Sequence, residues 1–148
     1  MGKEGVVMAS KQWRPRRRVL VVDDDPDIRL FLCDMLAHWR YEPLQAASGW
    51  EALEVLQCSR VDVVLLDLVM PTMDGLDTLH EIKRHYRDLP VIMMSALMTP
   101  QLGRELLAEG AQDWMEKPVR REALSVALLS VPTLSGRADH STTGSGDA

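Results

Sequence analysis

The residues best suited to do chemistry are acids that directly follow apolar segments. Asp67 ends a run rich in Val and Leu at residues 61–66, and Asp23 and Asp24 follow a shorter apolar run at 19–22. Such runs predict strands buried on both faces, as in a parallel sheet, and ligands of these sheets bind at the carboxyl ends of the strands. We therefore expect the three carboxylates to meet in one pocket.

Carboxylates gathered in this way repel one another unless a cation lies among them. Hard oxygen ligands completed by water favour Mg²⁺, so the sequence predicts a magnesium site formed by these acids. The alternative is that acids after strands serve only as helix caps. Asp25 followed by Pro26 has the form of such a cap. Capping alone does not account for Asp23, Asp24 and Asp67 together.

Strand-like and helix-like segments alternate along the chain, and together they predict the scaffold that must position these acids. Strands are expected at residues 19–22, 42–47, 61–66, 90–94 and 112–116. The segments between them show the three–four spacing of amphipathic helices, and a last helix is expected at 119–129. Ser48 with Glu51 forms a capping-box pattern, and Thr99 with Pro100 marks another helix start. Five β–α units predict the α/β class, with a flavodoxin-like, doubly wound sheet of five parallel strands and five helices.

Composition and charge indicate the domain organisation. The 148 residues suit one domain, expected at 19–130, and contain no run of eighteen apolar residues that could cross a membrane. Residues 1–18 carry six Lys or Arg against one Glu, lack periodicity and are expected to form a flexible basic arm. Residues 19–130 carry ten basic against nineteen acidic side chains, which argues against broad nucleic-acid binding by the folded part. Residues 131–148, rich in Ser, Thr, Gly and Asp, predict a disordered tail or linker.

The two cysteines give no sign of a metal or redox site. Cys33 and Cys58 lie in predicted helices and match no metal-ligand or redox spacing. Reduced and mostly buried thiols in a cytosolic protein are the expected state.

Four groups of residues, each at the expected end of a strand, resemble the receiver domain of two-component response regulators over roughly residues 18–130. They are Asp23 with Asp24, Asp67 with Met70, Pro71, Asp74 and Gly75, Ser95 with Ala96, and Lys117 with Pro118. The resemblance implies that Asp67 accepts a phosphoryl group from a phosphohistidine of a histidine kinase or histidine phosphotransfer protein. It also implies Mg²⁺ as cofactor, bound directly by Asp24 and Asp67, mainly through water by Asp23, and by the backbone carbonyl of Val69.

The resemblance implies roles for further side chains. Lys117 would pair with the phosphoryl oxygens, and Ser95 would donate its hydroxyl to one of them; a surface lysine and a serine bonded to local backbone are the alternatives. Trp114 stands where the family usually has Tyr or Phe, the aromatic residue that changes rotamer on activation, with core packing or surface cover as the alternative. Val69 and Leu97 stand where family members tune the phosphoryl lifetime, and as apolar side chains they cannot orient a water.

The expected function is a phosphoacceptor receiver domain that catalyses only its own phosphorylation and dephosphorylation. It is not expected to be an enzyme acting on a separate substrate. By resemblance, its output surface is built by the fourth helix, the fifth strand and the fifth helix, at residues 99–129, for an effector protein or output domain. A cytoplasmic location and no membrane partner are expected. Nucleic-acid contact is expected only through a lost output domain, and homodimerisation on phosphorylation is an option.

Two other functions fit parts of the sequence. A receiver-shaped binding module that is not phosphorylated is disfavoured by the complete acid set with Ser95 and Lys117. An Asp-nucleophile phosphatase, such as one of the haloacid-dehalogenase class, expects Asp-x-Asp at the nucleophile, whereas Leu68 and Val69 follow Asp67. Steady hydrolysis of phosphate esters would favour that phosphatase.

Overall fold

The core of the protein is a single parallel sheet. The structure, a computed structural model, describes residues 15–132. The strand order is β2-β1-β3-β4-β5. The strands are β1 (Arg18–Val22), β2 (Glu42–Ala46), β3 (Val63–Asp67), β4 (Val91–Ser95) and β5 (Asp113–Glu116). All four pairings are parallel, which confirms the predicted flavodoxin-like, doubly wound fold.

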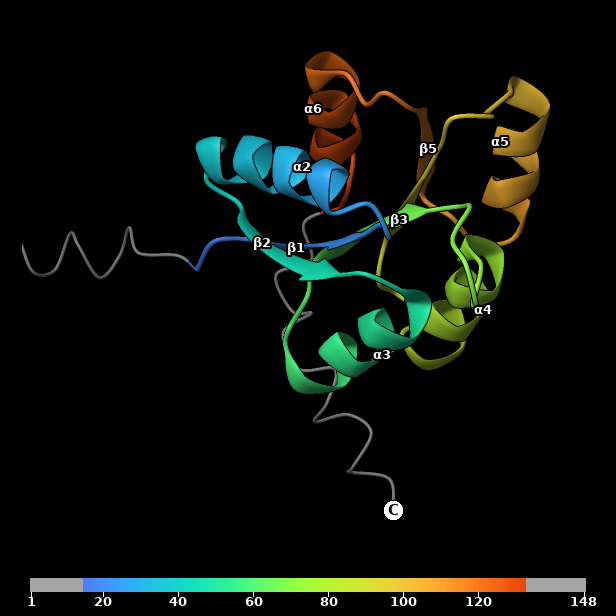
Figure 1. Ribbon diagram of the computed structural model, residues 1–148, viewed down its shortest axis with the longest axis horizontal. Coiled ribbons are helices and arrows are strands. Elements are labelled where there is room, and N and C mark those ends of the chain that lie inside the picture. The colour runs from blue at the N-terminus through green and yellow to red at the C-terminus, as the bar shows by residue number, and fades with distance from the viewer. Residues whose placement is uncertain (1–14, 133–148) are drawn as a thin grey trace, which may run out of the picture.

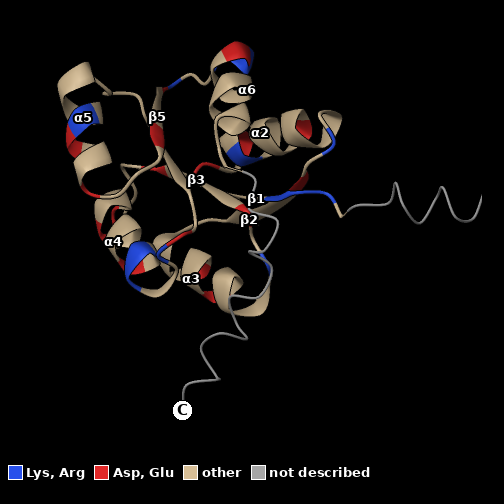
Figure 2. Cartoon of the chain, turned by 180° about the vertical axis from the view of Figure 1, so that it is seen from behind, with Lys and Arg blue, Asp and Glu red and all other residues tan. Residues whose placement is uncertain are grey.

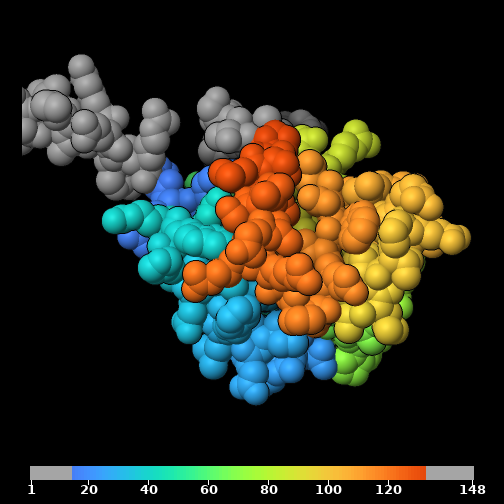
Figure 3. All heavy atoms as spheres, turned by 90° about the horizontal axis from the view of Figure 1, so that it is seen from above, coloured from blue at the N-terminus to red at the C-terminus, as the bar shows by residue number. Residues whose placement is uncertain are grey.

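Five helices cover the two faces of this sheet (Figure 1). They are α2 (Pro26–His38), α3 (Gly49–Cys58), α4 (Gly75–His85), α5 (Pro100–Ala108) and α6 (Arg121–Leu129). The buried side chains of α2 and α6 belong to one core cluster, and those of α3, α4 and α5 belong to the other. Seen from above, α6 lies between α2 and α5 (Figure 3). None of the helices in the described part of the chain has the length and hydropathy needed to cross a bilayer.

The position of β3 in the middle of the sheet explains why the residues before Asp67 are all apolar. Successive side chains of a strand point to opposite faces of the sheet. Val64 and Leu66 accordingly pack with α3 and α4, whereas Val63 and Leu65 pack with α2 and α6. Every residue of β3 is buried, including Asp67 at its end. The apolar run is therefore typical of a strand covered on both faces. Because Asp67 ends this strand, its carboxylate lies at the edge of the sheet.

The helix starts follow the predicted capping chemistry. Asp25 accepts a hydrogen bond from the Asp27 N–H at 2.9 Å, Ser48 from the Glu51 N–H at 3.1 Å, and Thr99 from the Leu102 N–H at 3.1 Å. These bonds satisfy backbone donors that a helix leaves free at its first turn. The last helix begins at Arg121, two residues later than expected, and the expected strand bounds hold to within one or two residues.

The ends of the chain differ in part from expectation. Most of the expected arm and tail, residues 1–14 and 133–148, lies outside the described residues. Basic residues lead into the start of β1 (Figure 2), and Arg18 is the first residue of that strand. Val131, one residue past the expected domain end, is buried in the core formed with α2 and α6. Cys33 is buried as expected, but the expectation of burial is wrong for Cys58, which ends α3 and is exposed.

Candidate functional site: an acidic pocket

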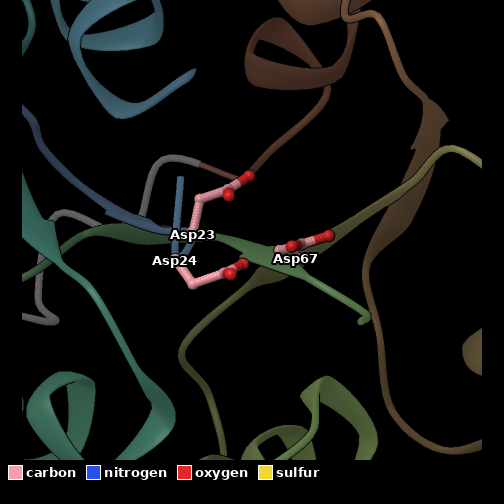
Figure 4. A group of neighbouring side chains, drawn as sticks. All are labelled: Asp23, Asp24 and Asp67. Atoms are coloured by element: carbon pink, nitrogen blue, oxygen red, sulfur yellow. The ribbon is translucent and has the colours of Figure 1, made fainter. Parts of the chain in front are cut away.

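The three predicted acids meet at the carboxyl edge of the sheet. Asp23 and Asp24 follow β1, and Asp67 is the last residue of its neighbour β3. One carboxylate oxygen from each lies within 4.8 Å of the other two (Figure 4). Asp23 is 0% and Asp67 4% exposed, whereas Asp24 faces solvent. The pocket is thus closed on the side of Asp23 and open on the side of Asp24.

Lys117 brings a positive charge to the two buried acids. Its Nζ lies 2.7 Å from Oδ2 of Asp23 and 3.1 Å from Oδ1 of Asp67. The ammonium reaches the acids from the end of β5, where the Lys117 N–H donates to the carbonyl of Ser95 at 2.9 Å. The Lys117–Pro118 peptide bond is cis. Lys117 is therefore not a free surface lysine, which was the alternative reading of its sequence position.

Ser95 completes the set of five residues that we call the acidic pocket: Asp23, Asp24, Asp67, Ser95 and Lys117. Ser95 ends β4 and is 1% exposed. Its Oγ accepts a hydrogen bond from the Leu97 N–H at 3.1 Å, so the local backbone contact considered from sequence is present. A hydroxyl that accepts in this way can still donate its own proton.

Burial and charge shift the titration of the pocket. Burial, and then the negative charge of Asp23, raise the pKa of Asp67 above its ordinary value, against opposing contributions from Lys117 and the Val69 N–H. Burial alone would lower the pKa of Lys117, but its contacts with Asp23 and Asp67 outweigh it and raise that pKa. Asp67 is thus a carboxylate whose charge the fold only partly compensates.

The donor set fits a hard divalent cation. Three carboxylates offer oxygen ligands, and the exposure of Asp24 leaves room for water. Among the described residues, no well-directed hydrogen bond reaches the buried Oδ2 of Asp23, although the Lys117 ammonium lies 2.7 Å away. A carboxylate oxygen has more than one lone pair, so Asp23 can pair with Lys117 and still accept a bond from a water. Asp24 and Asp67 would hold the metal from the open side of the pocket.

The loop after β3 is shaped by close backbone contact. The Gly75 N–H donates to the Leu68 carbonyl at 2.8 Å, and a β-carbon on Gly75 would overlap the carbonyl oxygen of Asp67. Val69 and Leu97, the two residues expected beside a phosphoryl group, are 62% and 75% exposed. The buried polar pocket thus has two solvent-exposed apolar residues in the loops that follow β3 and β4.

Sequence reasoning missed the partner of Trp114. The indole packs directly on α5 at Gly103, where a β-carbon would overlap its Cε2 and Nε1 atoms. We call this bare stretch of α5 backbone the indole slot. Trp114 is partly buried and packs against the core formed with α3, α4 and α5. The available signal was a glycine inside a helical pattern. Glycine destabilises a helix interior, so its presence there indicates a close contact with another part of the chain.

Comparison with known proteins points to one family. Residues 19–129 match the family described as the response regulator receiver domain. The chain is 33% identical to chemotaxis protein CheY4 of Vibrio cholerae, whose structure it matches with a TM-score of 0.75 over 80% of this chain and 100% of that one.

Two curated relatives are much longer proteins. Transcriptional regulatory protein ZraR of Klebsiella oxytoca is 37% identical over 74% of this chain and 25% of its own length. Sensor histidine kinase TmoS of Ectopseudomonas mendocina is 36% identical over 77% of this chain and 12% of its own length. The chain thus spans a quarter or less of these two relatives.

Proposed function

Because the chain belongs to the response regulator receiver domains of two-component systems, a family phosphorylated on aspartate, we propose that Asp67 is its phosphoacceptor. The observation that carries this proposal is the placement of Asp67. It is buried at the end of the central strand, 3.1 Å from the Lys117 ammonium and beside Asp23 and Asp24. A nucleophile of this kind needs to be a carboxylate near groups that offset phosphoryl charge, and the Lys117 ammonium beside Asp67 supports this role.

In the proposed reaction, one carboxylate oxygen of Asp67 attacks the phosphorus of a phosphohistidine. The new oxygen–phosphorus bond forms as the phosphorus–nitrogen bond breaks. Lys117 then pairs with phosphoryl oxygens, and the Ser95 hydroxyl donates to one of them. Ser95 ends β4, the neighbour of β3, and Lys117 directly follows β5, the neighbour of β4, so strands of the same sheet bring both groups to Asp67.

Receiver domains bind Mg²⁺ at an acidic pocket, and we propose that Asp24, Asp67 and the carbonyl of Val69 hold it directly here, with Asp23 acting mainly through water. A bound Mg²⁺ neutralises oxygen charge and orients the two reacting groups. Replacement of Asp24 by Ala should therefore abolish most Mg²⁺ binding, as measured by calorimetric titration. Normal binding by that variant would mean that the metal lies elsewhere.

Receiver domains interact with histidine kinases and output domains, and we propose a cytoplasmic histidine kinase or histidine phosphotransfer protein as the phosphoryl donor. The output surface would be α5, β5 and α6, the fourth helix, fifth strand and fifth helix expected from sequence. Leu107, Val126 and Leu129 on these helices are exposed apolar residues, which supports a surface for an effector, an output domain or a second copy. Any contact with nucleic acid would come through an output domain outside this chain.

Trp114 is proposed to report on this surface. Its indole lies against α5, and its strand pairs with β4, which ends at Ser95. A movement of Ser95 toward a phosphoryl group would change the environment of the indole. Because the chain has four tryptophans, residue-resolved NMR of the Trp114 indole N–H is the suitable measurement. A phosphoryl mimic such as beryllofluoride should shift that signal; an unchanged signal at saturation would place the switch elsewhere.

The function is tested by mass spectrometry after incubation with acetyl phosphate and Mg²⁺. The wild-type chain should gain one phosphoryl mass, and the Asp67→Asn variant should gain none. Asp34→Asn, an exposed acid of α2, is the matched control and should label like the wild type. Equal labelling of Asp67→Asn would refute the assignment. An unlabelled wild type would favour the non-phosphorylated binding module, and steady hydrolysis of phosphate esters would favour the phosphatase.

A further inference from the structure

Asp24 differs from the other acids of the pocket in how it is held. Asp23 contacts Lys117 and also accepts a hydrogen bond from the Asp25 N–H at 2.9 Å. Asp67 contacts Lys117 and the Val69 N–H. Among the described residues, the Asp24 carboxylate has no hydrogen-bond or ion-pair partner. Its position therefore depends on the backbone that carries it.

Hydrogen bonds to strand β2 and to helix α2 hold that backbone in place. The Asp23 N–H donates to the carbonyl of Ala46 on β2 at 3.2 Å. The Asp23 carbonyl, which belongs to the peptide unit that leads into Asp24, accepts from Nη1 of Arg29 at 2.7 Å. Nε of the same guanidinium donates to Oε1 of Gln45 at 3.0 Å. Arg29 thus ties the acidic loop to both α2 and β2.

The contact uses a property that only arginine has. A guanidinium presents several N–H donors in a fixed planar fork, so it can hold two acceptors in a defined mutual orientation. Here the two acceptors are the Asp23 carbonyl and the Gln45 side chain. A lysine would offer a single mobile ammonium in place of the fork. Neither contact reaches a carboxylate of the pocket, so Arg29 contacts the acidic loop only through its backbone.

We propose that Arg29, anchored by Gln45, is a positioning residue that fixes the Asp23–Asp24 peptide and so directs Asp24 toward the metal. The inference rests on the proposed function, because it concerns the same Mg²⁺ site. It assigns a part in metal affinity to an arginine of the first helix and a glutamine of the edge strand, neither of which is a proposed metal ligand.

Electrostatics and positioning predict opposite effects when Arg29 is replaced. Removal of a positive charge close to three carboxylates should strengthen the binding of a divalent cation. Loss of the clamp should weaken binding, roughly tenfold, since partners that orient metal ligands typically contribute 10–100-fold in affinity. The sign of the change in the Mg²⁺ dissociation constant therefore separates the two explanations.

The experiment is an Mg²⁺ titration of the full chain, followed by NMR of the backbone amides of residues 23–25. Arg29→Met is expected to bind roughly tenfold more weakly, and Arg29→Lys to fall between it and the wild type. Gln45→Ala leaves the charge unchanged and should also weaken binding. Arg84→Met is the matched control, because Arg84 is an exposed arginine that pairs with Glu81 within α4. It should leave Mg²⁺ affinity unchanged.

Binding by Arg29→Met that is as tight as wild type, or tighter, would overturn the proposal. If Arg29→Met fails to fold, Gln45→Ala decides, and an unchanged dissociation constant for that variant would likewise overturn it. The proposed function fails in a different way, because the wild-type chain itself would then show no saturable Mg²⁺ shift and no phosphoryl labelling.

Discussion

In the acidic pocket, side chains are held by directed polar contacts, whereas Trp114 is held against α5 by close packing. Lys117 makes ion pairs with Asp23 and Asp67, and Ser95 is bound to its own loop. The indole of Trp114 instead fits a stretch of helix that has no side chain at Gly103. The two regions lie on neighbouring elements of the same sheet, since β5 carries Trp114 and leads directly to Lys117.

The difference teaches what each region can tolerate. Polar contacts at strand ends are set by the sheet, and they fail when a charge or a donor is removed. A packed slot fails when volume is added, even a single methyl group, because a close-packed contact has no room to absorb it. The chemistry of the pocket and the movement of the indole should therefore respond to different substitutions.

The largest expected effect concerns the apolar residues beside the pocket. Val69 and Leu97 can neither hydrogen-bond to an attacking water nor orient it. Val69→Asn combined with Leu97→Glu should therefore speed loss of the phosphoryl group by about 10²-fold, the low end for a positioned acid–base group. The measurement is decay of the purified phosphoprotein in Mg²⁺ buffer.

The matched control for this variant is Leu30→Glu, which introduces a charge at an exposed leucine of α2 that is 55% accessible. It should decay like the wild type. A wild-type decay within seconds, or a double variant no faster than wild type, would show that these two side chains do not set the lifetime. The acidic pocket alone would then control both the gain and the loss of the phosphoryl group.

A smaller effect, on stability, is expected in the indole slot. Gly103→Ala adds a β-carbon where the indole lies, and overpacking of this kind costs about 1–3 kcal/mol of the free energy of unfolding. Replacing a glycine inside a helix by alanine raises the free energy of unfolding by about 0.5–1 kcal/mol. The variant should therefore be destabilised in urea unfolding, and the Trp114 indole N–H should shift.

The slot explanation is tested by repeating the substitution in a Trp114→Leu background. Without the indole, only the helix term remains, so Gly103→Ala should become stabilising by about 0.5–1 kcal/mol. An equal cost in both backgrounds would mean that Gly103 is needed for some other contact. Close packing against Gly103 would then not be what holds Trp114 in place.

The fold and the pocket were accessible from sequence for the same physical reason. Apolar runs such as 61–66 are required for doubly covered strands, and the residue that ends each strand must lie at the common edge. Asp67 could therefore be located from the pattern alone, whereas Ser95 and Lys117 were assigned to the pocket through the resemblance to receiver domains.

The indole slot and the Arg29 clamp were not accessible in this way. Gly103 and Trp114 are eleven residues apart on different elements, and Arg29 meets Gln45 across a helix and an edge strand. Each pair depends on how elements pack, which local patterns do not encode. Burial of Val131 was missed for a related reason, because its polar neighbours suggested a tail while a single side chain completed the core.

The smallest expected effect is the pH dependence of Asp67 in the apo protein. Burial and the charge of Asp23 raise its pKa above 3.8, so ionisation is less favourable in the folded than in the unfolded chain. For a carboxyl group with a raised folded pKa, the stabilising contribution is full below the unfolded pKa and is lost as pH rises through the folded pKa. Above its raised pKa, the ionised Asp67 therefore opposes folding.

Asp67→Asn should remove this penalty while Lys117 keeps its contact with Asp23 at 2.7 Å. The variant is expected to be more stable than wild type at pH 7, and the difference should shrink as pH falls through the raised pKa of Asp67 toward 3.8. Urea unfolding of both proteins over this range, without Mg²⁺, measures it, with the exposed Asp34→Asn as a control that should show no such trend. A variant less stable than wild type at pH 7 would mean that the ion pair with Lys117 outweighs burial and the charge of Asp23. The polar pocket would then be stabilised by its charges and not strained by them.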